Sequence, residues 1–251
     1  MKKNYAKEKI KNGGAALGVI SNTSDPLIAE FCGYGGLDYY MIDCEHGAIN
    51  INQVQDIVRA CEVANITPMA RIRSTDPKLI LQFMDAGVMG VMMPGVSEAS
   101  EIEALVAAMK YPPMGNRGLG PVRAWEFGLG KMPQVEYVQF ANEQTLVLPQ
   151  IEDIKAVENL EALCKVPGLD GFIIGPRDLA MSMGFYDGPA HDEVKKTIDH
   201  IFEVVLAHGL IIGTTAATGE QAKVLIDKGA KIIMNYVGGM LGQAIKAFTA
   251  P

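Results

Sequence analysis

The chain has 251 residues, of which 49% are hydrophobic and 20% are charged, and its formal net charge is -7. This composition supplies a sizeable core and argues against disorder. The acidic balance disfavours nucleic acid and anionic membranes as partners, because both select for a basic protein face.

No apolar run approaches the length of a membrane span, and the apolar run after "MKKNYAKEKIKNGG" is too short for a signal sequence. The cysteines form no C-x-x-C pair and have no metal-ligand spacing; they are Cys32, Cys44, Cys61 and Cys164. This usage is typical of free thiols in a reducing compartment. We therefore expect a soluble, cytoplasmic protein.

In chain order, short apolar runs rich in β-branched residues alternate with longer stretches of helical period. The expected strands cover residues 15–20, 38–43, 67–73, 87–94, 145–152, 169–175, 210–215 and 231–237. The expected helices cover residues 24–36, 75–87, 97–110, 154–166, 191–209, 218–230 and 238–248. The first two helices each begin with an acid followed by proline, at Asp25-Pro26 and Asp76-Pro77, and each ends in glycine.

Eight strand–helix repeats with near-continuous apolar strands predict a parallel sheet closed into one (β/α)8 TIM barrel, an α/β domain over residues 1–251. A doubly wound open sheet is the alternative, but no G-x-G-x-x-G follows the first strand. The segment 111–144, between the fourth and fifth strands, interrupts the alternation. A connection of this length is typical of a lid or a partner contact.

Polar and charged residues gather where the expected strands end. The second strand leads into Asp43, Glu45 and His46, the third into Arg71 and Arg73, the fifth into Gln150 and Glu152, and the sixth into Arg177 and Asp178. In a TIM barrel these carboxyl ends form one rim, where the chemistry takes place. Each residue also has a structural interpretation: His46 as a core histidine, Glu152 as a helix cap and Asp178 as an N-cap.

Taken together, these residue types favour a metal site. Two carboxylates with open positions suit Mg²⁺ or Mn²⁺, which keep waters and accept oxygens from the substrate. Zinc would require more His or Cys than this rim offers. Carboxylates, an arginine and a histidine are well matched to stabilising an enolate and moving a proton.

Six segments resemble, in order and spacing, the HpcH/HpaI aldolases, class II pyruvate aldolases of the phosphoenolpyruvate/pyruvate barrel superfamily. They are "MIDCEHGAIN", "PMARIRSTDP", "MDAGVMGVMMPGV", "YPPMGNRGLG", "LPQIE" and "GFIIGPRDLAMSMG". The resemblance implies reversible cleavage of a 4-hydroxy-2-oxo acid to pyruvate and an aldehyde, through an enolate bound to a divalent metal. Mg²⁺ or Mn²⁺ is the expected metal, with Co²⁺ as a third candidate. The resemblance also implies a homo-oligomer, a hexamer with exchanged C-terminal helices.

The resemblance also implies roles for individual residues. His46 would accept and donate a proton, Arg71 would stabilise the enolate oxygen, and Glu152 and Asp178 would hold the metal. The pyruvate unit would be contacted by Gln150 and by the segment Gly175, Pro176, Arg177 and Asp178. Many relatives have a small residue where this chain has Arg177, which could narrow the pocket, bind an acidic acceptor or face solvent.

The family further assigns an acid at the position of Asp85 to raising the basicity of His46. The helical pattern instead puts Asp85 at the end of a helix that finishes at the far rim of the barrel. Asp43 lies on the same strand face as Glu45 and is therefore the local candidate for orienting His46. A neighbouring subunit could reconcile the two assignments.

Two other functions remain open from the residues alone. A phosphate-handling barrel isomerase or lyase would use Thr214-Thr215 and Gly238-Gly239, which follow the last two strands. A non-catalytic barrel that binds an oxo acid is the other alternative. A lysine Schiff base is the rival aldolase chemistry, but we expect no lysine near the carboxyl ends of these strands, since Lys155 lies in a helix start and Lys231 before the last strand.

Overall fold

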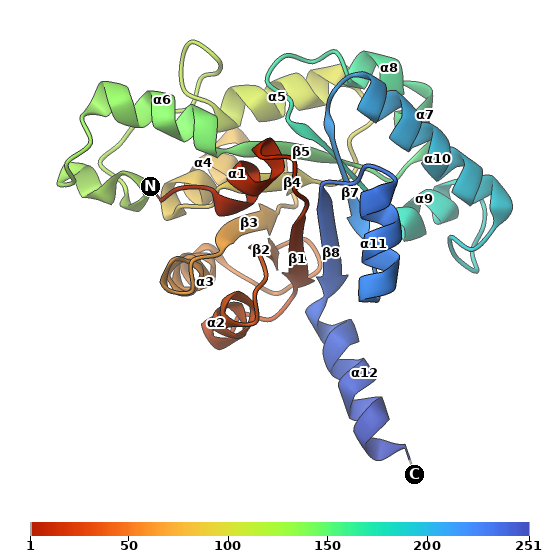
Figure 1. Ribbon diagram of the computed structural model, residues 1–251. Coiled ribbons are helices and arrows are strands. Elements are labelled where there is room, and N and C mark those ends of the chain that lie inside the picture. The colour runs from red at the N-terminus through yellow and green to blue at the C-terminus, as the bar shows by residue number, and fades with distance from the viewer. Residues whose placement is uncertain (1, 251) are drawn as a thin grey trace.

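The computed structural model, which describes residues 2–250, contains a closed barrel of eight parallel strands surrounded by helices (Figure 1). The strands are β1 (Ala16–Ser21), β2 (Tyr39–Asp43), β3 (Thr67–Arg71), β4 (Gly90–Met93), β5 (Leu146–Ile151), β6 (Gly171–Ile174), β7 (Ile211–Thr215) and β8 (Ile232–Tyr236). Each strand pairs with the next, and β8 pairs with β1 to close the ring. The predicted (β/α)8 barrel is confirmed, and the alternative of an open doubly wound sheet is wrong.

The structure contains more helices than expected, and one of the expected helices is interrupted. They are α1 (Tyr5–Lys11), α2 (Pro26–Tyr34), α3 (Ile51–Val63), α4 (Pro77–Ala86), α5 (Ala99–Met109), η1 (Arg123–Gly128), α6 (Gln134–Gln144), α7 (Ile154–Glu158), α8 (Leu160–Leu163), α9 (Pro176–Ser182), α10 (Asp192–Ala207), α11 (Gly219–Asp227) and α12 (Val237–Thr249). The expected helix 154–166 is interrupted at Asn159. Neither α1 nor α3 was predicted individually, although Asn50 and Gln53 form a capping box that marks the start of α3.

The predicted acid–proline starts behave as helix caps. The Asp25 carboxylate accepts the backbone N–H of Leu27, and the Asp76 carboxylate accepts that of Lys78. These bonds satisfy backbone donors that the first turn of a helix leaves unpaired. At the other end of α4, Gly87 adopts a left-handed conformation with φ of 106°, which glycine adopts without steric cost.

Two apolar layers hold the barrel together. The inner layer fills the barrel with side chains that include Met41, Met69, Met92, Leu148 and Met234. The outer layer packs the alternate residues of the strands against the helices. Because the interior is filled, the barrel has a packed core rather than a channel, and the site must lie at one of its ends.

The connection between α5 and β5 lies at the amino-terminal end of the barrel. Its Arg117 binds Asp85, the penultimate residue of α4, with an Nη2–Oδ1 distance of 2.8 Å. Its Arg123 bonds to the Ala86 carbonyl at 3.0 Å and pairs with Glu62 near the end of α3. Helices α3 and α4 end where β3 and β4 are about to begin, so this segment lies opposite the carboxyl ends of the strands. The expectation that 111–144 forms a lid over the site of the same chain is therefore wrong.

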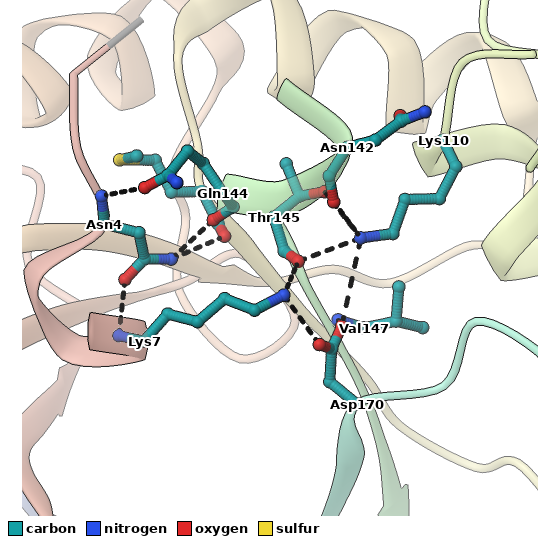
Figure 2. Close-up of polar contacts among 9 residues, drawn as sticks. Asn4, Lys7, Lys110, Asn142, Gln144, Thr145, Val147 and Asp170 are labelled. Atoms are coloured by element: carbon teal, nitrogen blue, oxygen red, sulfur yellow. Dashed lines mark hydrogen bonds and ion pairs between the residues drawn. The ribbon is translucent and has the colours of Figure 1, made fainter. Parts of the chain in front are cut away.

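A polar network links the start of the chain around α1 to the segments that precede β5 and β6 (Figure 2). The buried ammonium group of Lys110 donates to the carbonyls of Asn142 and Thr145, and Lys7 donates to the Thr145 carbonyl and to Asp170. Ala6 of α1 is fully buried beside the inner layer. The amino-terminal end of the barrel is therefore closed by α1, which leaves the carboxyl end for the chemistry.

Within residues 2–250, no helix combines the length and the apolar character needed to cross a bilayer.

Candidate active site

Asp43 organises the turn that follows β2. Its carboxylate accepts the backbone N–H groups of Glu45 and His46, both at 3.2 Å. At Gly47 an added Cβ would come within 2.2 Å of the Asp43 carbonyl oxygen, so the turn has room only for glycine there. The sequence Asp-Cys-Glu-His-Gly therefore folds tightly on itself and directs Glu45 and His46 to the rim of the barrel.

Arg71, the last residue of β3, pairs with this turn from the neighbouring strand. Its Nε and Nη2 donate to the two carboxylate oxygens of Asp43 at 2.9 and 2.7 Å, and Nε lies 3.2 Å from Oε2 of Glu45. Burial acts to lower the pKa of Arg71, but the hydrogen bonds and charge of Asp43, followed by Glu45 and Tyr236, raise it above its ordinary value. Arg71 therefore remains a fixed positive charge at the mouth of the barrel.

Glu152 follows β5 and is held by two contacts. Its Oε1 accepts the backbone N–H of Gly95, after β4, at 2.7 Å, and the Gln150 amide donates to its Oε2. Gln150 is buried, and its Oε1 has no partner among the described residues. The interpretation of Glu152 as a helix cap is wrong, because Asp153 caps α7.

The environment of Glu152 disfavours its ionised form. Burial, followed by the charges of Asp178 and Glu45, raises the pKa of Glu152 to about 7, while the Gly95 N–H and Arg71 oppose the shift. The carboxylates of Asp178 and Glu45 thus repel the carboxylate of Glu152, as like charges in a partly buried site do. A bound cation would relieve this repulsion.

The segment after β6 approaches Glu152 closely. An added Cβ at Gly175 would come within 2.5 Å of the Gln150 amide nitrogen and 3.0 Å of Glu152 Oε2, so both side chains occupy the space that glycine leaves free. Pro176 is the first residue of α9, which places Asp178 in its first turn rather than at the N-cap. The interpretation of Asp178 as an N-cap is therefore wrong. Arg177 is exposed.

These residues surround a cleft of about 420 Å³, within the usual range of small-molecule sites. Its lining consists of Glu45, His46, Gly95, Ser97, Glu152, Asp153, Lys155, Asp178 and Ser182. They come from the segments that follow β2, β4, β5 and β6. The cleft therefore lies at the carboxyl rim and brings together His46, Glu152 and Asp178, three of the residues predicted from the sequence.

His46 faces the cleft and is not a core residue. Its side chain is 66% exposed, and its Nε2 lies 3.8 Å from Oε2 of Glu45. Asp43 acts on the backbone of His46 and on Arg71, whereas the carboxylate beside the imidazole is that of Glu45. The expectation that Asp43 orients the imidazole directly is therefore wrong. Asp43 positions His46 through the backbone instead.

Asp85 lies away from this cleft. It is near the end of α4, at the amino-terminal end of the barrel, where it pairs with the buried Arg117. Burial raises the pKa of Asp85, against the effect of the Arg117 hydrogen bond and charge. A direct action of Asp85 on His46 of the same chain is therefore wrong.

The expectation that no lysine lies near the carboxyl ends of the strands is wrong, and sequence reasoning also missed Tyr236. Lys155 lines the cleft, with its Nζ 2.7 Å from Oε1 of Glu98. Hydrogen bonding and charge from Glu98 raise the pKa of Lys155, the opposite of what a Schiff-base nucleophile needs. Tyr236, the last residue of β8, is near enough to Arg71 to affect its pKa. The strand-end rule would have identified both side chains if it had been applied to the first turn of α7 and to the end of β8.

The donor set fits a hard divalent cation bound by few protein ligands. Glu152 and Asp178 line the same cleft, and the charge of Asp178 raises the pKa of Glu152. Carboxylate oxygens are the ligands that Mg²⁺ and Mn²⁺ prefer. Within residues 2–250 no group of three or more His, Cys, Asp or Glu side chains is placed so that it could hold a metal ion, so the protein would supply no more than these two carboxylates. Two carboxylates would leave positions open for substrate and water.

The residues suggested for a phosphate site are used differently. The Thr214 hydroxyl is buried and donates to the Ile174 carbonyl at 3.5 Å. Gly238 and Gly239 lie inside the first turn of α12. The residues that line the cleft follow β2, β4, β5 and β6, whereas the residues suggested for phosphate lie at the ends of β7 and β8.

The chain is similar to aldolases in sequence and structure. The family model described as HpcH/HpaI aldolase/citrate lyase matches residues 17–245. The chain is 32% identical to a hydroxypyruvate/pyruvate aldolase of Cupriavidus necator, over 90% of this chain and 84% of the relative. It is 34% identical to a 4-hydroxy-2-oxo-heptane-1,7-dioate aldolase of Salmonella typhimurium, over 92% and 87%. The crystal structure of an HpcH/HpaI aldolase from Desulfitobacterium hafniense superposes with a TM-score of 0.91 at 28% identity, covering 98% of this chain and 97% of that one.

Proposed function

The chain belongs to the HpcH/HpaI aldolase/citrate lyase family and is a carbon–carbon lyase, and we propose that it is a divalent-metal-dependent pyruvate aldolase. Its substrate would be a 4-hydroxy-2-oxo acid, which it cleaves reversibly to pyruvate and an aldehyde. The observation that carries this proposal is the cleft in which Glu152, Asp178 and His46 meet beside the Asp43–Arg71 pair.

Glu152 and Asp178 would hold the metal. When bound, the metal acts as a Lewis acid that polarises the 2-oxo group, which stabilises developing negative charge by several kcal/mol. The raised pKa of Glu152 supports this assignment, because a group that resists ionisation alone gains most from a neighbouring cation.

Arg71 supplies the fixed positive charge for the enolate. Both oxygens of Asp43 hold its guanidinium group in one orientation, so no reorganisation is needed when negative charge appears on the substrate oxygen. Gln150 adds an amide oxygen without a hydrogen-bond partner among residues 2–250, which can accept a hydrogen bond from substrate or water.

His46 would move the proton. In the cleavage direction its imidazole accepts the proton of the 4-hydroxyl group as the C3–C4 bond breaks, and the aldehyde leaves. A proton then returns to C3 of the enolate, which gives pyruvate. The exposed ring supports this role because it lines the cleft, where it can reach a bound substrate.

The test is exchange of the pyruvate methyl protons with deuterium, measured by NMR without any aldehyde. We expect exchange that requires Mg²⁺ or Mn²⁺ and stops with EDTA. His46→Ala should bind the metal but lose exchange by about 10²–10⁴-fold, the usual contribution of general acid–base catalysis. Glu152→Gln should lose metal affinity.

The matched control is His200→Ala, on the exposed surface of α10, which should exchange like the wild type. Full exchange in His46→Ala would contradict the proposed proton transfer. Pyruvate binding without exchange in the wild-type protein would favour the non-catalytic oxo-acid-binding barrel instead.

A further inference from the structure

One cationic side chain of the cleft has no part in the proposed chemistry. Among the described residues that line the cleft, Lys155 alone carries a permanent positive charge, against the carboxylates of Glu45, Glu152, Asp153 and Asp178. Hydrogen bonding and charge from Glu98 raise the pKa of Lys155. The ammonium group is therefore charged at any physiological pH.

Lys155 lies at the outer part of the cleft. Gln150 is buried and Glu152 is half-buried, whereas Asp178 is exposed and the Lys155 side chain is 57% exposed. A 2-oxo acid held at Glu152 and Asp178 would thus extend from the half-buried part of the cleft toward the exposed part that includes Lys155. The group that reaches this cation is the end of the substrate that becomes the aldehyde.

The partner of Lys155 can be exchanged at little cost. Its ion pair with Glu98 has an Nζ–Oε1 distance of 2.7 Å, and both side chains are exposed. Exposed pairs of this kind contribute little to stability, because solvent screens the two charges. An anionic ligand group can therefore take the place of Glu98 with a small loss, and the flexible stem of lysine lets the ammonium group follow it.

We propose that Lys155 selects substrates whose aldehyde portion carries an anionic group such as a carboxylate, and that Glu98 competes with this group for the ammonium ion. The inference rests on the proposed function, because it assumes that the 2-oxo acid end lies at Glu152 and Asp178. It assigns Lys155 to the binding of the distal end and to no step of bond cleavage.

The experiment compares two stable 2-oxo acids of equal chain length, 2-oxoadipate and 2-oxohexanoate, by calorimetric titration with Mg²⁺ present. They differ only in a terminal carboxylate or methyl group. We expect the wild-type protein to bind 2-oxoadipate about tenfold more tightly, a normal gain for one charge-assisted hydrogen bond. Lys155→Met should remove this preference, and Glu98→Gln should increase it about two- to threefold, because the competing carboxylate is gone.

Lys165→Met is the matched control, since Lys165 also pairs with a glutamate, Glu161 at 3.9 Å, but lies outside the cleft lining. It should keep the wild-type preference. A preference that survives Lys155→Met, or that disappears in Arg177→Met instead, would overturn the proposal.

The outcome is separate from that of the deuterium exchange. A preference that depends on Lys155 in a protein without exchange would support this inference and contradict the aldolase. Exchange without any preference would do the reverse.

Discussion

Asp43 and Arg71 are both nearly fully buried at the mouth of the barrel, and each depends on the other. A buried charge without a partner is costly, so breaking such a pair from one side is far more disruptive than its net contribution suggests. Asp43 also fixes the turn that carries Glu45 and His46. One carboxylate therefore supports two residues of the proposed site.

Asp43→Asn should reduce both stability and activity. The amide can still accept a backbone N–H but leaves Arg71 with only the more exposed carboxylate of Glu45 as a charged partner, which we expect to lower the free energy of unfolding by about 3 kcal/mol. Pyruvate exchange should fall on the order of 10²-fold, because Arg71 loses its fixed orientation. Urea unfolding and the NMR exchange assay measure the two effects.

Asp56→Asn provides the comparison, since Asp56 forms an exposed pair with Arg59 at 2.5 Å on the surface of α3. Its effect on stability should stay within about 0.5 kcal/mol. Equal effects of the two substitutions would show that burial of the Asp43–Arg71 pair does not govern its contribution.

At the scale of elements, the C-terminus of α6 is the point where several segments meet. Thr145 follows α6, and its carbonyl accepts from both Lys7 of α1 and Lys110 at the end of α5 (Figure 2). Two cations at a helix C-terminus compensate its partial negative charge. Burial of Lys110, followed by the charge of Lys7, lowers its pKa to about 8, while Asp170 opposes the shift.

This pKa predicts a pH dependence of stability. The folded protein releases the Lys110 proton near pH 8, whereas the unfolded chain keeps it until about pH 10.5. Between these values the unfolded state binds more protons, so this group makes the folded protein more stable as pH rises. Relative to Lys110→Met, the wild-type free energy of unfolding should increase by about 2 kcal/mol from pH 8 to pH 9.5.

Urea titrations of both proteins at the two pH values test this, with the exposed Lys196→Met as the control that should follow the wild type. Parallel pH profiles of the wild type and Lys110→Met would mean that the carbonyl acceptors keep Lys110 charged despite its burial.

The elements also show what local patterns can and cannot provide. The starts of α2 and α4 were predictable, because an acid before proline satisfies the free N–H groups of a first turn by itself. The location of 111–144 was not. Only the pairing of Arg117 with Asp85 and of Arg123 with Glu62 puts this segment at the amino-terminal end.

At the scale of the whole molecule, α12 extends away from the barrel (Figure 1). None of its residues is buried, and Leu241, Ile245 and Phe248 form an apolar stripe at helical spacing, with Phe248 91% exposed. An apolar stripe of this kind is typical of a surface that another chain covers. We propose that a second copy covers it in a homo-oligomer.

The triple substitution Leu241→Ser, Ile245→Ser and Phe248→Ser should therefore dissociate the assembly. Each of these side chains contributes roughly 1.5–3 kcal/mol when it is fully buried, so losing all three should weaken the interface by several kcal/mol. Sedimentation velocity should show a smaller species than the wild type. A wild-type protein that sediments as a monomer would contradict the proposal. In such an assembly Asp85 of one subunit could lie near His46 of another, which would still allow the role that the family resemblance implies for Asp85.

The sequence by itself determined the alternation of strands and helices, the closed barrel and the rim on which Asp43, His46, Arg71, Glu152 and Asp178 lie. It could do so because strand polarity and the carboxyl-end rule depend on local order along the chain. Only the tertiary structure decided that Asp43 holds Arg71 rather than the imidazole, that Asp85 pairs with Arg117 and that Lys155 pairs with Glu98. These depend on contacts between segments distant in the chain, which no local pattern encodes.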